Sequence, residues 1–223
     1  MGTLSVVATP IGNLEDITLR ALRTLKECDV IYAEDTRVIA KLLARYEIKK
    51  PLQRLDAATE LKKASEVIAR LEAGEHIALV SDAGTPGISD PGTQLVAQVR
   101  AHLPEAKIET IPGASALTAA LSIAGMDMGS FTFFGFLPHK KGRQTALKKV
   151  ATSEIPVVLY ESPHRIVKLL KELESLQISR VTIARELTKI HEEVVAGALS
   201  DVAEHFSAHP ETVRGEFVVI VAP

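Results

Sequence analysis

Short apolar runs alternate along the chain with segments of helical periodicity, and turn residues separate the two. The runs are rich in β-branched and aromatic side chains, which favours strands over helices. Strands that alternate with helices are typical of α/β architecture. The sequence predicts strands at residues 4–8, 30–33, 76–81, 107–111, 131–136, 157–160, 181–184, 193–196 and 216–221.

Several segments between these runs carry an apolar stripe with a period near 3.6 residues. One stripe predicts a helix at residues 17–27, and another predicts a helix at 60–73 with Gly74 as its C-cap. Asp90 followed by Pro91 predicts a further helix start, with the carboxylate as N-cap and the proline at the first helical position.

A hinge is predicted at Pro112-Gly113, where a strand ends and a helix beginning near Ala114 follows. No internal repeat or low-complexity tract interrupts the pattern. The sequence therefore predicts two α/β domains, residues 1–112 and 113–223.

Composition narrows the class of protein. With 46% hydrophobic and 24% charged residues in 223, the chain has ordinary globular composition. The start of the chain lacks a basic region followed by an apolar stretch, and no apolar run is long enough to span a membrane, so we expect a cytoplasmic protein. Cys28 is the single cysteine, which excludes an internal disulfide and a thiolate metal cluster; we expect it to be buried. The net charge of -2 argues against bulk attraction to nucleic acid but leaves a local basic face open.

The segment SDAGTPGISDPG, residues 81–92, is the strongest candidate for a ligand-binding loop. It follows a predicted strand, which is where open α/β sheets place ligands, and its glycines let the backbone approach a ligand. The chain has no GKS or GKT phosphate loop and no G-x-G-x-x-G fingerprint, so a nucleoside triphosphate or a dinucleotide is disfavoured. A second small-residue loop, PGASA, begins at Pro112, and its helix start offers free amides to ligand oxygens.

Three polar clusters follow other predicted strands, and strand-end loops often carry function. They are AEDTR at residues 33–37, YESPHR at 160–165 and ARELTKIHEE at 184–193. No Ser-His-Asp order is defensible, and HEE at 191–193 lacks the second histidine that zinc would need, so no metal is expected. The densest basic patch, PHKKGR at 138–143, follows a phenylalanine-rich strand and can grip phosphates or lie solvated; Arg37, Lys41 and Arg45 form a second basic stripe at helical spacing.

In chain order, VVATPIGNLEDIT, AEDTR, SDAGTPGISDPG, IPGASA, YESPHR and ARELTKIHEE resemble a bacterial family that methylates a cytidine ribose 2′-hydroxyl in small-subunit (16S) ribosomal RNA. That family belongs to the tetrapyrrole methylase superfamily. The resemblance covers residues 4–221. It implies a two-lobed class III α/β methyltransferase, each lobe a mixed sheet flanked by helices. The family works as a homodimer and binds S-adenosylmethionine in the cleft between the lobes.

The resemblance also implies site residues. The donor contacts would be Pro10, Gly12, Ser81, Asp82, Ala83, Gly84, Thr85, Ser115, Ala116 and Tyr160. The attacking hydroxyl needs alignment and proton removal, for which Asp35, Glu161 and Lys189 are candidates by position. The RNA contacts would be Arg37, Lys140, Lys141, Arg143, Arg165 and Arg185, of which Arg37, Arg165 and Arg185 also suit a dimer interface.

Two alternatives stay open. One is a methylase of a tetrapyrrole or corrin precursor, which would share the donor site; AEDTR and YESPHR favour the RNA substrate. The other is a non-catalytic RNA-binding module for ribosome assembly. Family members often continue beyond the last strand, whereas this sequence ends at Pro223, so we expect weaker recognition of the ribosomal particle if that segment grips RNA.

Overall fold

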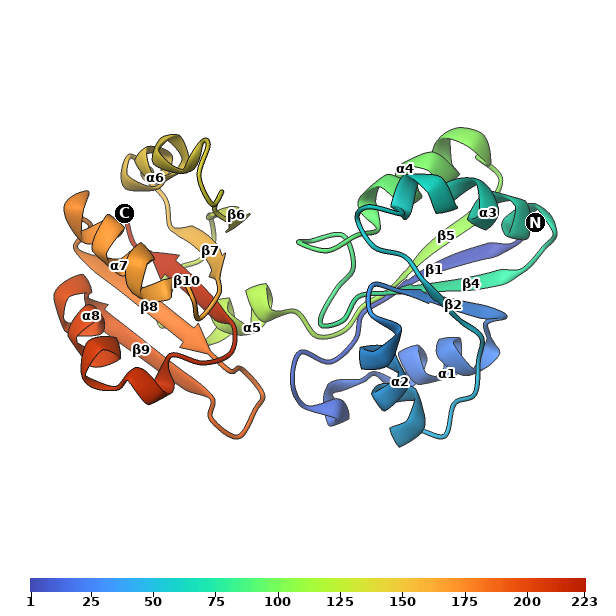
Figure 1. Cartoon of the computed structure of the whole chain (residues 1–223), viewed down its shortest axis with the longest axis horizontal. Helices are drawn as coiled ribbons and strands as arrows, with labels where there is room; N and C mark the ends of the chain where they lie inside the picture. Colours follow the sequence, from blue (N-terminus) through green and yellow to red (C-terminus); the bar gives the residue numbers. More distant parts are fainter. The chain divides into compact units, whose positions relative to one another are not determined.

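The computed structural model describes all 223 residues, which form two compact α/β units, Met1–Ser115 and Ala116–Pro223 (Figure 1). The predicted α/β class is confirmed. The boundary between the units follows Ser115, shortly after the hinge expected at Pro112-Gly113. Each unit has its own sheet, with buried apolar side chains packed on it.

The first unit holds a five-stranded sheet in the order β3-β2-β4-β1-β5. All neighbouring strands run parallel, so the sheet has one carboxyl edge at which every strand ends. An isolated antiparallel bridge lies outside the named strands. The strands are β1 (Thr3–Val7), β2 (Val30–Ala33), β3 (Leu52–Arg54), β4 (His76–Val80) and β5 (Lys107–Ile111).

Helices cover both faces of this sheet, as its buried strands require. Apolar side chains of α1 (Leu19–Glu27) and α2 (Thr36–Arg45) form one core with Val7, Ile31 and Val80. Those of α3 (Glu60–Glu72) and α4 (Thr93–His102) form a second core with Leu4 and other residues that alternate with the first set along the strands. A short 3-10 helix, η1 (Leu14–Asp16), precedes α1.

The second unit holds a mixed sheet in the order β6-β7-β10-β8-β9, in which only β6 and β7 pair in parallel. One face packs against α6, α7 and α8, and α5 lies against β10. The strands are β6 (Thr132–Phe136), β7 (Val157–Glu161), β8 (Arg180–Arg185), β9 (Glu193–Ala198) and β10 (Phe217–Val221). The helices are α5 (Ala116–Ile123), α6 (Arg143–Ala151), α7 (Ile166–Ser175), α8 (Leu199–Ala208) and the 3-10 helix η2 (Pro210–Thr212).

All nine predicted strands are confirmed, to within a few residues at their ends. The strand β3 was not predicted, because its three residues include Gln53 and Arg54 and lie at an edge of the sheet. Cys28 is fully buried as expected, and burial raises the pKa of its thiol to about 11. None of the helices combines the length and the apolar character that crossing a bilayer would require.

Candidate functional site

Four loops of the first unit leave its sheet at the same edge (Figure 1). Val7 of β1 pairs with both Val80 of β4 and Ile111 of β5, so these three parallel strands end level with one another. The loops that follow the strands are residues 8–13, 34–35, 81–92 and 112–115. They include the glycine-rich segment and three of the other motifs, at the edge where open α/β sheets bind ligands.

Thr9 and Gly84 hold two of these loops together. The backbone N–H of Thr9 donates to the Gly84 carbonyl at 2.9 Å, and that of Gly84 donates to the Thr9 carbonyl at 3.0 Å. Gly84 has a φ of +84°, in the left-handed region that favours glycine. A Cβ at Gly84 would lie 3.4 Å from Ile11 Cγ2 and 3.7 Å from the Ala114 carbonyl. The glycine therefore permits the backbone conformation that joins the loops.

Hydroxyl groups reinforce the same junction. The buried hydroxyl of Ser81 donates to the Gly84 carbonyl at 2.9 Å, and the Thr9 hydroxyl donates to the Ser81 carbonyl at 3.1 Å. Thr85 Oγ1 donates to the Ala114 carbonyl at 3.3 Å, which ties in the loop after β5. The Ser81 side chain thus shapes the loop, and its predicted contact with a donor stays a prediction.

Carboxylates from three loops make this edge negative. Asp82 Oδ1 accepts the backbone N–H of Asp35 at 2.9 Å. Asp35 also accepts the backbone N–H of Arg37 at 2.8 Å, as the N-cap of α2, and hydrogen bonds from the Arg37 side chain lower the pKa of Asp35 to about 2. Burial, followed by the charges of Asp82 and Asp56, raises the pKa of Glu34. An edge that resists ionisation of a further carboxylate favours a cationic ligand over an anionic one.

The far end of the glycine-rich loop is capped from another helix. The predicted helix start at Asp90-Pro91 is wrong, because α4 begins at Thr93 and Gly92 is its N-cap. The buried carboxylate of Glu60 in α3 accepts the backbone N–H groups of Gly92 at 2.9 Å and Leu95 at 2.8 Å. A carboxylate at a helix N-terminus satisfies free amides and interacts favourably with the helix dipole. Glu60 therefore caps α4 from outside the local sequence.

In the second unit, Tyr160 lies among aromatic side chains. Its ring makes edge contacts with Phe133 and Phe136, with centroids 5.0 and 5.6 Å apart. Phe136 is exposed, and a register shift in β6 between Phe133 and Gly135 places these rings beside β7. Lys140 and Lys141 follow β6 on the exposed surface, where the basic patch was predicted.

The neighbouring charged residues are not on that surface. The side chain of Glu161 is fully buried and lies 2.7 Å from Arg165 Nη2 and 3.8 Å from Arg143 Nη2. Arg143 is also buried and pairs with Glu172 at 2.6 Å. Burial and pairing withdraw Arg143 from the basic surface in which we expected it, and they leave Glu161 no access to a substrate proton. We interpret this group as a structural ion-pair cluster.

The loop after β8 has a strained backbone. Glu186 and Thr188 have φ angles of +49° and +67°, which side chains rarely adopt. Lys189 Nζ donates to Glu186 Oε1 at 2.7 Å. A Cβ on Gly215 would lie 1.7 Å from Glu186 Oε1, so the Glu186 side chain occupies the space that this glycine leaves. Strain of this kind clusters at functional loops, which keeps Lys189 a candidate.

Arg185 is buried at the start of the same loop. Its Nε lies 2.5 Å from Glu193 Oε2, and His205 Nε2 lies 3.0 Å from Glu193 Oε1. Ion pairing and burial of Arg185 argue against a phosphate contact, whereas Arg165 is only partly buried beside Glu161 and its predicted contact stays a prediction. Arg37, by contrast, is 87% exposed despite its pair with Asp35. No cluster of three or more His, Cys, Asp or Glu side chains in the chain has a geometry suited to a metal ion.

The family model of the tetrapyrrole (corrin/porphyrin) methylases matches residues 3–203. The chain belongs to this family. Among curated relatives, the methylase is 43% identical over 223 residues to ribosomal RNA small subunit methyltransferase I of Thermotoga maritima, covering 100% of this chain and 99% of the relative. It is 46% identical over 227 residues to the Synechocystis sp. protein of the same name, covering 100% and 79%.

Solved structures share the fold at lower identity. The methylase resembles the methyltransferase CobJ with a TM-score of 0.72 at 23% identity, covering 100% of this chain and 94% of that one. It resembles diphthine synthase with a TM-score of 0.73 at 16% identity, covering 100% and 90%. A Thermus thermophilus uroporphyrin-III C-methyltransferase complexed with S-adenosyl homocysteine gives 0.62 at 20% identity, covering 99% and 97%.

The structure brings some of the predicted residues together and adds others. In the first unit, Asp35, Asp82, Gly84 and Thr85 lie on loops that hydrogen-bond directly or through a shared partner. Ala116 and Tyr160 belong to the second unit, and their predicted contacts with the donor stay predictions. Sequence analysis missed three residues of this edge as site residues, namely Thr9, Glu34 and Glu60. Only Glu34 had a signal, its place beside Asp35 at a strand end.

Proposed function

We propose that this methylase transfers a methyl group from S-adenosylmethionine to the 2′-hydroxyl of a cytidine ribose in small-subunit (16S) ribosomal RNA. The observation that carries the proposal is the 43% identity, over nearly the whole of both chains, to a relative named ribosomal RNA small subunit methyltransferase I. Family membership gives methyl transfer as the reaction class. The donor, the RNA and the ribose hydroxyl are the proposed part.

The carboxyl edge of the first unit fits this donor. S-adenosylmethionine supplies an electrophilic methyl group bound to a positively charged sulfur. Asp82 and the other carboxylates of the edge suit a cation and disfavour the phosphates of a nucleotide cofactor. The crystal of a structural neighbour with S-adenosyl homocysteine agrees with such a ligand. We propose that this unit holds the donor through Pro10, Gly12, Asp82, Ala83, Gly84 and Thr85.

Methyl transfer by in-line displacement requires an aligned ribose oxygen that loses its proton during or after attack. Asp35, with a pKa near 2 and a hydrogen-bonded arginine, is a weak base. Glu34, one residue earlier, has a raised pKa and lies beside Asp82. A raised pKa favours proton acceptance over a lowered one, so we propose Glu34 ahead of Asp35 as the acceptor, set aside the buried Glu161 and keep Lys189 as a candidate.

Methyl transfer to ribosomal particles tests the function directly. Small subunits from a strain lacking the enzyme, and naked 16S rRNA from the same strain, are incubated with enzyme and methyl-labelled S-adenosylmethionine. We expect label in ribose 2′-O-methylcytidine after nuclease digestion. If neither RNA is labelled although calorimetry shows that the donor binds, the assignment of RNA as the substrate is wrong. That result would favour the tetrapyrrole or corrin precursor. Absence of donor binding at about millimolar concentration would favour the non-catalytic module.

By the same family resemblance we propose that the enzyme is a cytoplasmic homodimer. Sedimentation equilibrium measures the oligomeric state without reference to activity. A monomer at micromolar concentration would contradict the dimer and would leave the methyl-transfer proposal to its own test.

A further inference from the structure

A strongly basic face lies on the first unit, away from the predicted PHKKGR patch. Residues 36–54 contain six lysines and arginines and a single carboxylate, Glu47, in a chain whose net charge is -2. The segment comprises α2, the connection after it and β3. Nothing in the proposed donor site uses this concentration of positive charge.

Four of these cations have no carboxylate within ion-pair distance: Lys41, Arg45, Lys49 and Lys50. The other two form ion pairs close by in the sequence, Arg37 with Asp35 and Arg54 with Asp56. Unpaired cations gathered on one face repel one another and create a positive potential that attracts a polyanion. Fold stability gives no reason for such an arrangement.

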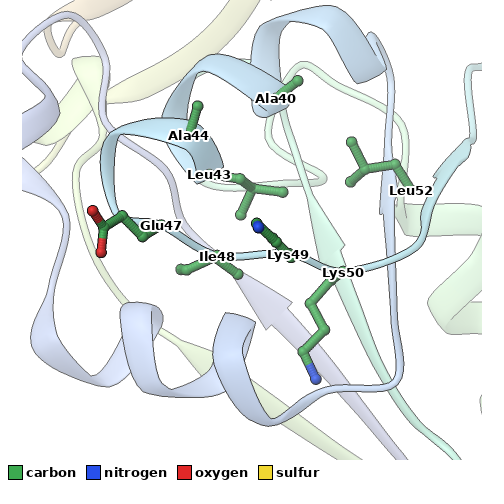
Figure 2. Close-up of a pocket in the computed structure, with 8 residues that line it drawn as sticks. All are labelled: Ala40, Leu43, Ala44, Glu47, Ile48, Lys49, Lys50 and Leu52. Atoms are coloured by element: carbon green, nitrogen blue, oxygen red, sulfur yellow. The ribbon is translucent and has the colours of Figure 1, made fainter.

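The same face is hollowed. A depression of about 760 Å³ lies between the helix α2 and the chain that leads to β3 (Figure 2). Apolar side chains form most of its lining, and Lys49 and Lys50 stand among them. The lining residues are Ala40, Leu43, Ala44, Glu47, Ile48, Lys49, Lys50 and Leu52.

The depression exists because of alanines at solvent-exposed positions of a helix. Ala40 and Ala44 are exposed one turn apart on the outer side of α2, and their short side chains leave a hollow above Leu43 and Ile48, which are themselves buried. A hollow with short apolar side chains at its rim and lysines beside it matches a nucleotide, whose base has flat aromatic faces and whose phosphate is anionic.

The basic face also begins at the donor edge. The N-cap of α2 is Asp35, which accepts a hydrogen bond from Arg37 and is itself bonded to Asp82 in the glycine-rich loop. From there α2 extends over ten residues, about 15 Å, along the side of the unit. An RNA strand whose reacting ribose lies at the carboxyl edge of the sheet can therefore continue over Lys41 toward Lys49.

We propose that α2 and residues 46–54 form an RNA-binding surface, on which Lys41, Arg45, Lys49 and Lys50 contact phosphates and the depression receives one unstacked nucleotide. The proposal rests on the proposed function as an RNA methylase. A second copy of the chain fits this face less well, because a two-fold interface would bring its own cations together. The surface extends the substrate contacts beyond the reacting nucleotide.

The electrostatic part is tested with the triple variant Lys41→Gln, Lys49→Gln and Lys50→Gln. Binding to labelled 16S rRNA is measured by filter retention between about 50 and 200 mM salt. Each lost phosphate contact lowers the salt slope by about one, so we expect a reduction of about three and roughly 10- to 100-fold weaker binding at the lowest salt. Donor affinity, measured by calorimetry, should stay the same.

The matched control removes the same charge elsewhere, through Lys62→Gln, Arg100→Gln and Lys171→Gln. These exposed residues have no ion-pair partner and lie outside the proposed surface. We expect a much smaller change in salt slope. Equal salt slopes for the two triple variants would overturn the proposed RNA-binding surface. Methyl transfer by the wild type would still support the proposed function in that case. A wild type that neither binds nor methylates rRNA would overturn both.

The depression is tested without any change in charge. The double variant Ala40→Leu and Ala44→Leu fills it with side chains that favour helix. We expect about 5-fold or greater loss of RNA affinity with an unchanged salt slope and an unchanged circular dichroism spectrum. RNA affinity equal to that of the wild type in the folded variant would show that the depression does not bind a nucleotide. A change in sedimentation of either lysine or alanine variant would identify the face as a contact between copies and overturn the proposal.

Discussion

The carboxylate of Glu60 lies 2.9 Å from the backbone nitrogen of Gly92, at the last residue of the glycine-rich loop. The same Oε1 atom accepts the N–H of Leu95 at 2.8 Å. One buried side chain of α3 therefore fixes both the end of the loop and the first turn of α4.

Glu60→Ala should destabilise the first unit by about 1–3 kcal/mol, because it leaves two amide groups without their buried acceptor. The loop end should also become less ordered, so we expect weaker binding of S-adenosylmethionine. Urea denaturation and calorimetry measure the two effects. Glu72→Ala, at an exposed position of the same helix, is the control and should change neither quantity. Equal behaviour of the two variants would refute the capping role.

Glu161→Gln should unfold the second unit more easily, by about 3–5 kcal/mol, because it removes the buried charge that faces Arg165 and the buried Arg143. At temperatures where the variant is folded, kcat for methyl transfer should stay close to the wild-type value. A general base would behave in the opposite way, with unchanged stability and a loss of 100-fold or more in kcat. Glu174→Gln, exposed on α7, supplies the matched control.

Gly215→Ala should have two separable effects. The left-handed φ of +73° costs about 1–2 kcal/mol for a residue with a Cβ. The new Cβ also displaces the Glu186 carboxylate, which removes the partner of Lys189. Gly125→Ala has a similar φ of +67° and no atom within 4 Å of the added Cβ, so it isolates the first effect.

Both glycine variants should lose comparable stability in thermal unfolding, but only Gly215→Ala should impair methyl transfer if Lys189 takes part. Full activity in the Gly215 variant would remove Lys189 and its loop from the catalytic candidates.

The pH dependence of stability should differ in sign between two adjacent carboxylates. A carboxyl group whose pKa is raised on folding destabilises the folded state once ionised, so Glu34→Gln should raise stability at pH 7 and have no effect well below pH 4. Asp35 has a lowered pKa of about 2, so its contribution is present above about pH 4 and is lost as the pH falls toward 2.

Asp35→Asn should therefore lower stability at pH 7, in contrast to Glu34→Gln. Urea midpoints measured at half-unit pH intervals compare the two variants with the wild type. A gain of stability for Glu34→Gln that persists at pH 3 would contradict a titration of Glu34. If Glu34 accepts the substrate proton, the same variant should lose most of its methyl transfer at full stability.

Most of the fold could be predicted because its strands are apolar runs and its connections carry strong turn residues. The edge strand β3 could not, since Gln53 and Arg54 face an environment that needs no apolar pattern. The start of α4 shows another limit. Asp90-Pro91 is a good local cap, yet a carboxylate 32 positions before Gly92 caps the helix, and single-sequence patterns contain no information on such a contact.

The candidate site divides in the same way. Loops at the carboxyl edge were predictable from strand ends, as Asp82 and Gly84 illustrate. The exposure of charged side chains was not predictable, because YESPHR and PHKKGR look equally polar in the sequence. In the structure Arg143 and Glu161 are buried and face each other, whereas Lys140 is exposed. Charge type alone does not distinguish a buried ion pair from a phosphate contact.

The two sheets are assembled around strands from opposite ends of the sequence. In the first unit the inner strand β1 is made first, and its neighbours β4 and β5 are complete by residue 111. In the second, β10 lies between β7 and β8 although it follows both in the sequence. During translation, the first unit can close while the chain is still growing. The second unit cannot complete its sheet until residues 217–221 have left the ribosome, so its apolar strands stay unpaired for longer during synthesis.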